Sequence, residues 1–132
     1  MWSFDVQTDR RVVFVDITSR LREAAHGLGV ANGALVAYVP HTTAGITINE
    51  NADPAVQADM EMALDHLVPS TLPFTHREGN SDAHVKASLM GSSVTVPLSA
   101  GRLQLGTWQG VYLAEFDGPR RRRVVVTALS GD

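Results

Sequence analysis

Three short apolar segments follow one another in the last third of the chain, with only turns between them. They cover residues 103–106, 111–116 and 124–129. Two further strand-like segments, 34–39 and 45–50, precede them. Strands that follow one another directly, rather than alternating with helices, favour antiparallel pairing. The sequence therefore predicts an α+β fold, an antiparallel β-sheet or sandwich with two to three helices packed against it.

Helix signals occur in three places. The clearest begins at Asp53-Pro54, because the carboxylate can accept hydrogen bonds from free amides while proline at the first helical position gives up none. Residues 18–28 and 82–90 carry shorter apolar patterns that end at glycines. Near the N-terminus, segments 4–7 and 11–16 flank a short polar turn and predict a β-hairpin.

The composition of the chain excludes several classes of function. A chain of 132 residues with 44% apolar residues can close one core, so we expect a single domain over 1–132. The net charge of -3 gives no global attraction to nucleic acid or anionic lipid. Cysteine is absent, so a metal would need histidine or carboxylate ligands. Neither a signal-peptide pattern nor an apolar stretch of membrane-spanning length is present, and a cytoplasmic location is expected.

Three of the five histidines occur where side chains could reach a cleft. His41 follows a strand, His76 lies in a loop rich in proline and glycine, and His84 begins the third helix. Three imidazoles around one metal leave a fourth position for water or substrate, as catalytic zinc sites require. His41 is also a candidate catalytic base, and its alternative is a histidine hydrogen-bonded at a strand end. His26 and His66 are interpreted as structural.

A second polar group lies where a strand meets the second helix. Glu50, Asn51 and Asp53 stand near the helix N-terminus, which attracts anions. Asp53 is interpreted mainly as a cap, whereas Glu50 is a candidate catalytic group and Asn51, with Asp53, a candidate substrate contact. Asp82 is another candidate catalytic group, which either caps the third helix or orients a histidine ligand.

The C-terminal half adds further candidate substrate contacts. Alternation along a strand places neighbouring arginines of the run 120–123 on opposite faces. Arg120 and Arg122 could bind phosphate through the planar guanidinium, the alternative being a charged edge strand. Trp108 and Gln109 interrupt a strand pattern between two glycines, which predicts either a bulge or an aromatic lid over a ligand.

Four ordered blocks of the sequence resemble the signature of the YjbQ family. The blocks are residues 41–54 (HTTAGITINENADP), 78–89 (EGNSDAHVKASL), 105–110 (LGTWQG) and 115–120 (EFDGPR). Matches in this order are far more specific than one short motif. The resemblance implies a homotrimer of small, strand-rich subunits. It places the family's histidines on His41, His76 and His84, and its acidic and amide positions on Glu50, Asn51, Asp53 and Asp82.

The resemblance also implies an activity. Family members are linked to thiamine-phosphate synthesis, in which hydroxymethylpyrimidine diphosphate joins a thiazole phosphate and pyrophosphate leaves. Imidazole ligands favour zinc, whereas diphosphate chemistry normally uses magnesium, which is expected only during turnover. Two alternatives remain open. One is a metal-assisted hydrolase of a small phosphorylated substrate, and the other is a non-catalytic trimeric small-molecule-binding protein.

Overall fold

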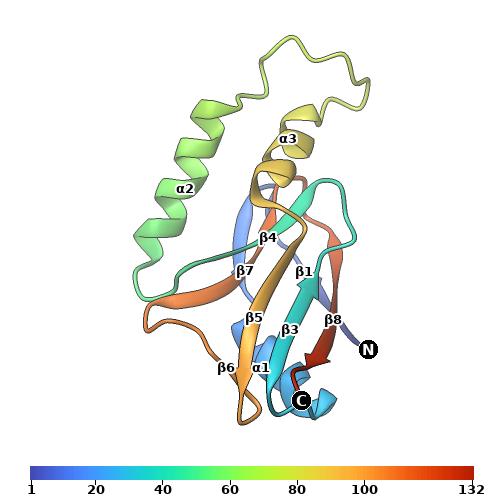
Figure 1. Ribbon diagram of the computed structural model, residues 1–132. Helices are drawn as coiled ribbons and strands as arrows, with labels where there is room; N and C mark the ends of the chain where they lie inside the picture. Colours follow the sequence, from blue (N-terminus) through green and yellow to red (C-terminus); the bar gives the residue numbers. More distant parts are fainter.

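The computed structural model describes residues 1–132 and contains two antiparallel sheets and three helices (Figure 1). The five-stranded sheet has the order β1-β8-β3-β5-β6, and the three-stranded sheet has the order β2-β7-β4. This arrangement confirms the predicted α+β fold. The strands of the larger sheet are β1 (Trp2–Gln7), β3 (Gly33–Tyr38), β5 (Ser93–Ser99), β6 (Arg102–Leu103) and β8 (Arg121–Ser130), and those of the smaller are β2 (Val13–Asp16), β4 (Ala44–Glu50) and β7 (Gln109–Glu115).

Strand β7 is buried on both faces and separates two apolar clusters. Val111 and Leu113 belong to the larger cluster, which fills the space between the sheets and includes α1 (Thr18–Leu28). Tyr112 and Ala114 belong to the smaller cluster, which lies beneath α3 (Ser81–Met90). Side chains alternate along a strand, so one strand can serve both clusters.

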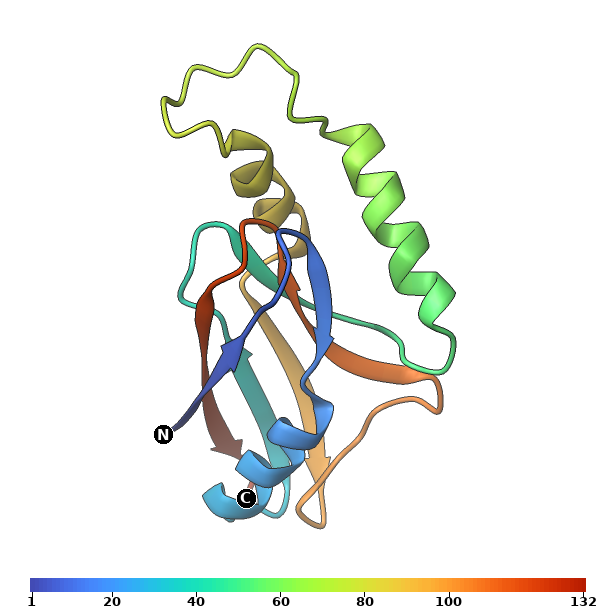
Figure 2. The same cartoon turned by 180° about the vertical axis from the view of Figure 1, so that it is seen from behind.

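Helix α2 (Pro54–Leu67) stands apart from the body in both views (Figures 1 and 2). The predicted cap is confirmed, because Asp53 Oδ1 accepts from the Ala55 N–H at 2.9 Å. Leu64 is the one buried residue of the helix, and Leu67 is 69% exposed. Met60 packs partly buried against the smaller cluster, whereas Met62 and Leu67 are exposed. None of the three helices is long and apolar enough to cross a bilayer.

The predicted N-terminal hairpin is wrong. Its two segments do form strands, but β1 pairs with β8 and β2 pairs with β7, in different sheets. Thr8 holds the crossing between them. Its N–H donates to the Arg120 carbonyl at 2.9 Å, and its buried hydroxyl donates to Glu115 Oε1 at 2.8 Å. Contacts from distant strands therefore override the local turn signal.

The predicted strand at 103–106 is largely wrong as well. Strand β6 ends at Leu103, and the chain then forms a turn in which the Gly106 N–H donates to Gln109 Oε1 at 2.8 Å. Trp108 lies in this turn and is 63% exposed. After a last hydrogen bond from the Gln104 N–H to the Pro97 carbonyl of β5 at 2.9 Å, local hydrogen bonding replaces strand pairing.

A polar candidate site between two histidines

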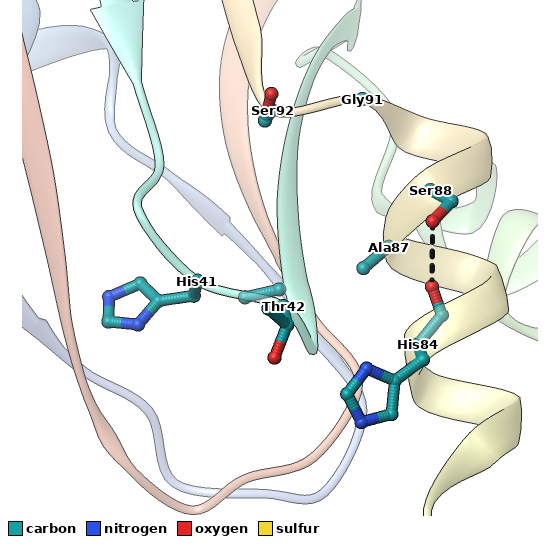
Figure 3. Close-up of a pocket in the computed structure, with 8 residues that line it drawn as sticks. His41, Thr42, His84, Ala87, Ser88, Gly91 and Ser92 are labelled. Carbon is teal, nitrogen blue, oxygen red and sulfur yellow. Dashed lines mark hydrogen bonds between the residues drawn. The ribbon is translucent and has the colours of Figure 1, made fainter.

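A polar pocket of about 460 Å³ lies between the start of β4 and the side of α3 (Figure 3). Its lining offers two imidazoles and the hydroxyls of one threonine and two serines, but no lysine, arginine or carboxylate. A charged ligand would therefore find no ionic partner in the lining itself. The lining residues are His41, Thr42, Ala44, His84, Ala87, Ser88, Gly91 and Ser92.

Small residues allow α3 to approach β4 closely enough to form one wall of this pocket. Ala83 and Ala87 are buried on α3, and Gly45 faces the end of the helix. A Cβ at Gly45 would lie 2.7 Å from the carbonyl oxygen of Gly91, which is closer than real contacts allow. The same carbonyl accepts from the Ile46 N–H at 3.0 Å. This hydrogen bond fixes the end of α3 to β4.

His76 and His84 lie together at the start of α3. Their ring centroids are 5.4 Å apart and their planes are nearly perpendicular, at 88°. Two imidazoles on one tetrahedral ion, with metal–nitrogen distances of about 2.0–2.1 Å, would have centroids roughly 5 Å apart. The residues present therefore fit two ligands of a single ion. Glu78 Oε2 lies 3.9 Å from His76 Nε2, so a carboxylate is also near.

His41 does not join this pair. Its ring points away from His84, and Thr42 lies between them (Figure 3). Its Nε2 accepts a hydrogen bond from the Arg123 N–H at 2.9 Å, as in the strand-end alternative considered from the sequence. No group of three histidine or acidic side chains within the chain could hold a metal. The predicted three-histidine set is thus not assembled by one chain alone.

Burial lowers the pKa of His41, because a charged imidazolium is poorly solvated there. The positive charge of Arg122 lowers the pKa further, while the negative charge of Glu115 opposes this effect. His41 is therefore a neutral imidazole at neutral pH. In a neutral imidazole, one ring nitrogen accepts a hydrogen bond and the other donates one.

A buried ion pair lies behind the His41 segment. Glu115 and Arg122 are 0% and 4% exposed, and Arg122 Nε donates to both carboxylate oxygens of Glu115, at 2.8 and 3.1 Å. Arg122 Nη2 also donates to Thr43 Oγ1 at 2.8 Å. Arg122 is therefore a structural group rather than an open phosphate contact. Arg120 is likewise paired, with Asp117 Oδ2 at 2.9 Å.

Asp82 is a buried ion-pair centre outside the pocket lining. Arg11 Nη2 donates to its two oxygens at 3.0 and 3.2 Å, and Lys86 Nζ lies 3.6 Å away. The capping residue of α3 is Asn80, which makes no side-chain cap hydrogen bond. Asp82 thus neither caps the helix nor orients a histidine in this arrangement.

The ion pairs of Asp82 should make stability fall in acid. Burial raises the pKa of this carboxyl, but the hydrogen bond and charge of Arg11, with Lys86, outweigh burial and hold the pKa below its usual value. The stabilisation is therefore present above about pH 4, the usual pKa of a free aspartate, and is lost as pH falls through the lower folded-state pKa. Asp82→Asn should cost about 1.5–3 kcal/mol at pH 7 and flatten the acid limb in urea unfolding. An unchanged acid limb would contradict this assignment.

The other predicted contacts lie at the far end of β4. Asn51, Trp108 and Gln109 gather there around Gly110, where a Cβ would lie 2.8 Å from Asn51 Cβ. The carbonyl of Glu50 accepts from Tyr112 at 3.0 Å and from Gln57 at 2.6 Å. The seven residues of β4 separate this region from His41 by roughly 20 Å. Neither Asp53 nor its neighbours line the histidine pocket.

Sequence reasoning did not identify Glu115, Thr43, Ser88 or Ser92 as part of this region. Glu115 carried a signal, since it is a single charged residue in an otherwise apolar strand. Buried charges are rarely tolerated without a specific partner. The two serines carried no signal that distinguishes them from ordinary surface residues.

Comparison with known proteins identifies close relatives. The family model described as "UPF0047 protein YjbQ-like" matches residues 3–131. A UPF0047 protein of Methanocaldococcus jannaschii is 52% identical, over 98% of this chain and 94% of its own length. YugU of Bacillus subtilis is 47% identical, over 96% and 97% of the two chains. A crystal structure of an uncharacterised YjbQ/UPF0047 protein from Clostridium acetobutylicum has a TM-score of 0.96 at 49% identity, covering 98% and 100%.

Proposed function

The chain belongs to the YjbQ-like UPF0047 family, and we propose that it is a metal-dependent enzyme acting on a small phosphorylated molecule in the pocket between His41 and His84. The observation that carries this proposal is the perpendicular pair of His76 and His84, with centroids 5.4 Å apart. This spacing suits two ligands on one ion, and edge-to-face packing of two aromatic rings is the metal-free alternative with the same geometry. The relatives' names state no activity, so the reaction is our inference.

The metal would be held by His76 and His84, and zinc suits these ligands best. A divalent ion supplies Lewis acidity and compensates phosphate charge. The hydroxyls of Thr42, Ser88 and Ser92 can orient a polar substrate at the pocket wall. Because no basic side chain lines the pocket, its residues alone cannot neutralise a phosphate.

The transferase reaction implied by the YjbQ resemblance is the first activity to test. It would join a pyrimidine diphosphate to a thiazole phosphate. One observation favours the hydrolytic alternative. Arg122 is buried in its pair with Glu115 and is not free to stabilise a departing pyrophosphate, and Arg120 would first have to leave Asp117. Hydrolysis of a monophosphate releases no pyrophosphate, but it also needs cationic help, which the metal would supply.

We also propose that the chain forms a homotrimer. Exposed apolar side chains gather on α2, on α3 and in the loop joining them, and a single chain supplies only two clustered histidines. Light scattering on the full chain should give three times the mass of 14.2 kDa. A monomer at micromolar concentration would contradict this assembly. The apolar residues are Met62, Leu67, Leu72, Phe74, Val85 and Leu89.

Elemental analysis of untagged protein, combined with turnover assays, tests the proposed function. We expect a stoichiometric transition metal, loss of turnover after chelation and recovery when zinc is returned. Assays with both thiamine precursors together and with each alone separate the transferase from the hydrolase. Metal-free protein that binds phosphorylated compounds without product would instead identify a non-catalytic binding protein and reject the enzyme.

A further inference from the structure

Two successive residues of strand β8 contact the chain around His41. Arg123 contacts His41 itself, and Arg122 contacts Thr43. Strand β3 last pairs with β8 at Tyr38, opposite Val125, and the chain then leaves the sheet through Pro40. Beyond this point no β3 carbonyl faces β8. The imidazole of His41 accepts the Arg123 N–H instead, at 2.9 Å from Nε2.

This hydrogen bond determines which ring nitrogen carries the proton. An acceptor nitrogen must present its lone pair, so Nε2 is unprotonated while it binds the Arg123 N–H. The neutral ring then carries its proton on Nδ1. None of the side-chain hydrogen bonds of the chain involves Nδ1 of His41, and His41 is among the residues that line the pocket.

The buried side chain of Arg122 also favours the neutral form of His41. Its guanidinium donates to Thr43 Oγ1 at 2.8 Å, while the Thr43 carbonyl accepts from the Phe116 N–H at 3.2 Å. Strand β8 and the residue that follows β7 thereby hold the backbone next to His41. The buried guanidinium also places a positive charge near the ring and disfavours a second proton, with Arg120 acting in the same direction and Glu115 against it.

We propose that β8 fixes His41 as a neutral hydrogen-bond donor, whose Nδ1–H recognises a carbonyl or phosphoryl oxygen of the ligand, with Arg122 as its positioning residue. The donor role rests on the proposed function of the pocket, but the protonation state of the ring does not. A metal at Nε2 would have to displace the Arg123 N–H. His41 is thus distinguished chemically from His76 and His84.

Side-chain ¹⁵N NMR of the full-length, metal-free protein tests the protonation state. We expect a pyridine-type shift at Nε2 of His41 and a pyrrole-type shift at Nδ1. His26 and His66 serve as internal references, since neither ring takes part in a side-chain hydrogen bond. A proton on Nε2 of His41, or a shared population like that of the references, would overturn the inference even if the protein proves to be a metalloenzyme.

A variant at Thr43 tests the positioning role of Arg122. Thr43→Val removes the hydroxyl that Arg122 binds and leaves the Glu115 pair intact. The Nε2 shift of His41 should move toward the protonated value, with folding verified by circular dichroism. An unchanged shift would exclude Arg122 as the positioning residue.

The ligand contact is tested with inorganic phosphate, added to wild-type protein reconstituted with zinc. Nδ1 of His41 should shift more than Nδ1 of His26 or His66. Equal shifts would reject the donor role while leaving the protonation state and the enzyme proposal standing.

Discussion

Replacing Arg122 with methionine should destabilise the fold by about 3–5 kcal/mol, the usual cost of removing one partner of a buried ion pair. Glu115 is fully buried and would lose both hydrogen bonds from Arg122 Nε. Thr43 would lose its contact with the guanidinium as well. Urea unfolding at pH 7 measures the change in the free energy of unfolding.

Two further variants separate charge from volume. The double variant Glu115→Gln with Arg122→Met should recover part of the loss, because the unpaired buried charge is removed and the amide oxygen can still accept one of the two hydrogen bonds, from Thr8 or from the Asp117 N–H. Arg121→Met is the matched control, since Arg121 pairs with Asp5 at the surface and should change stability by less than about 1 kcal/mol. Equal effects of Arg121→Met and Arg122→Met would exclude the buried pair as the source of the loss.

The sequence predicted elements whose causes are local. Helix α2 begins at Pro54 because Asp53 and proline act on the first turn directly. The N-terminal hairpin failed because its strands are held by residues more than a hundred positions away, where Thr8 meets Arg120 and Glu115. The spacing of apolar residues in either segment does not indicate which distant strand it pairs with.

The candidate site was predicted only in part, because its geometry also depends on contacts between residues far apart in the sequence. Strand alternation indicated that only one face of the arginine run could serve a site, but not that Arg122 would be paired with Glu115 inside the core. The proximity of His76 and His84 depends on how the loop after α2 returns to α3. No spacing rule describes that return, because a long loop does not hold its ends at a fixed distance.

Alanine at His76 or His84 should remove most of the metal affinity. If the two rings bind one ion, losing either should weaken zinc binding by more than the roughly 10–100-fold that loss of a supporting residue costs. Competition with a chromophoric chelator measures the affinity, and turnover should fall in parallel. His26→Ala and His66→Ala are matched controls, because these histidines lie outside the pair and outside the pocket.

His41→Ala decides between the two roles considered for that residue. As a hydrogen-bond donor, His41 can be lost with the zinc affinity nearly unchanged while substrate recognition weakens. As a third ligand contributed to a neighbouring subunit, its loss should reduce the zinc affinity as strongly as His84→Ala does. Because Nε2 already accepts the Arg123 N–H at 2.9 Å, we expect the first result. If the His76 and His84 variants bind zinc as tightly as the unmodified protein, the proposed metal site is rejected.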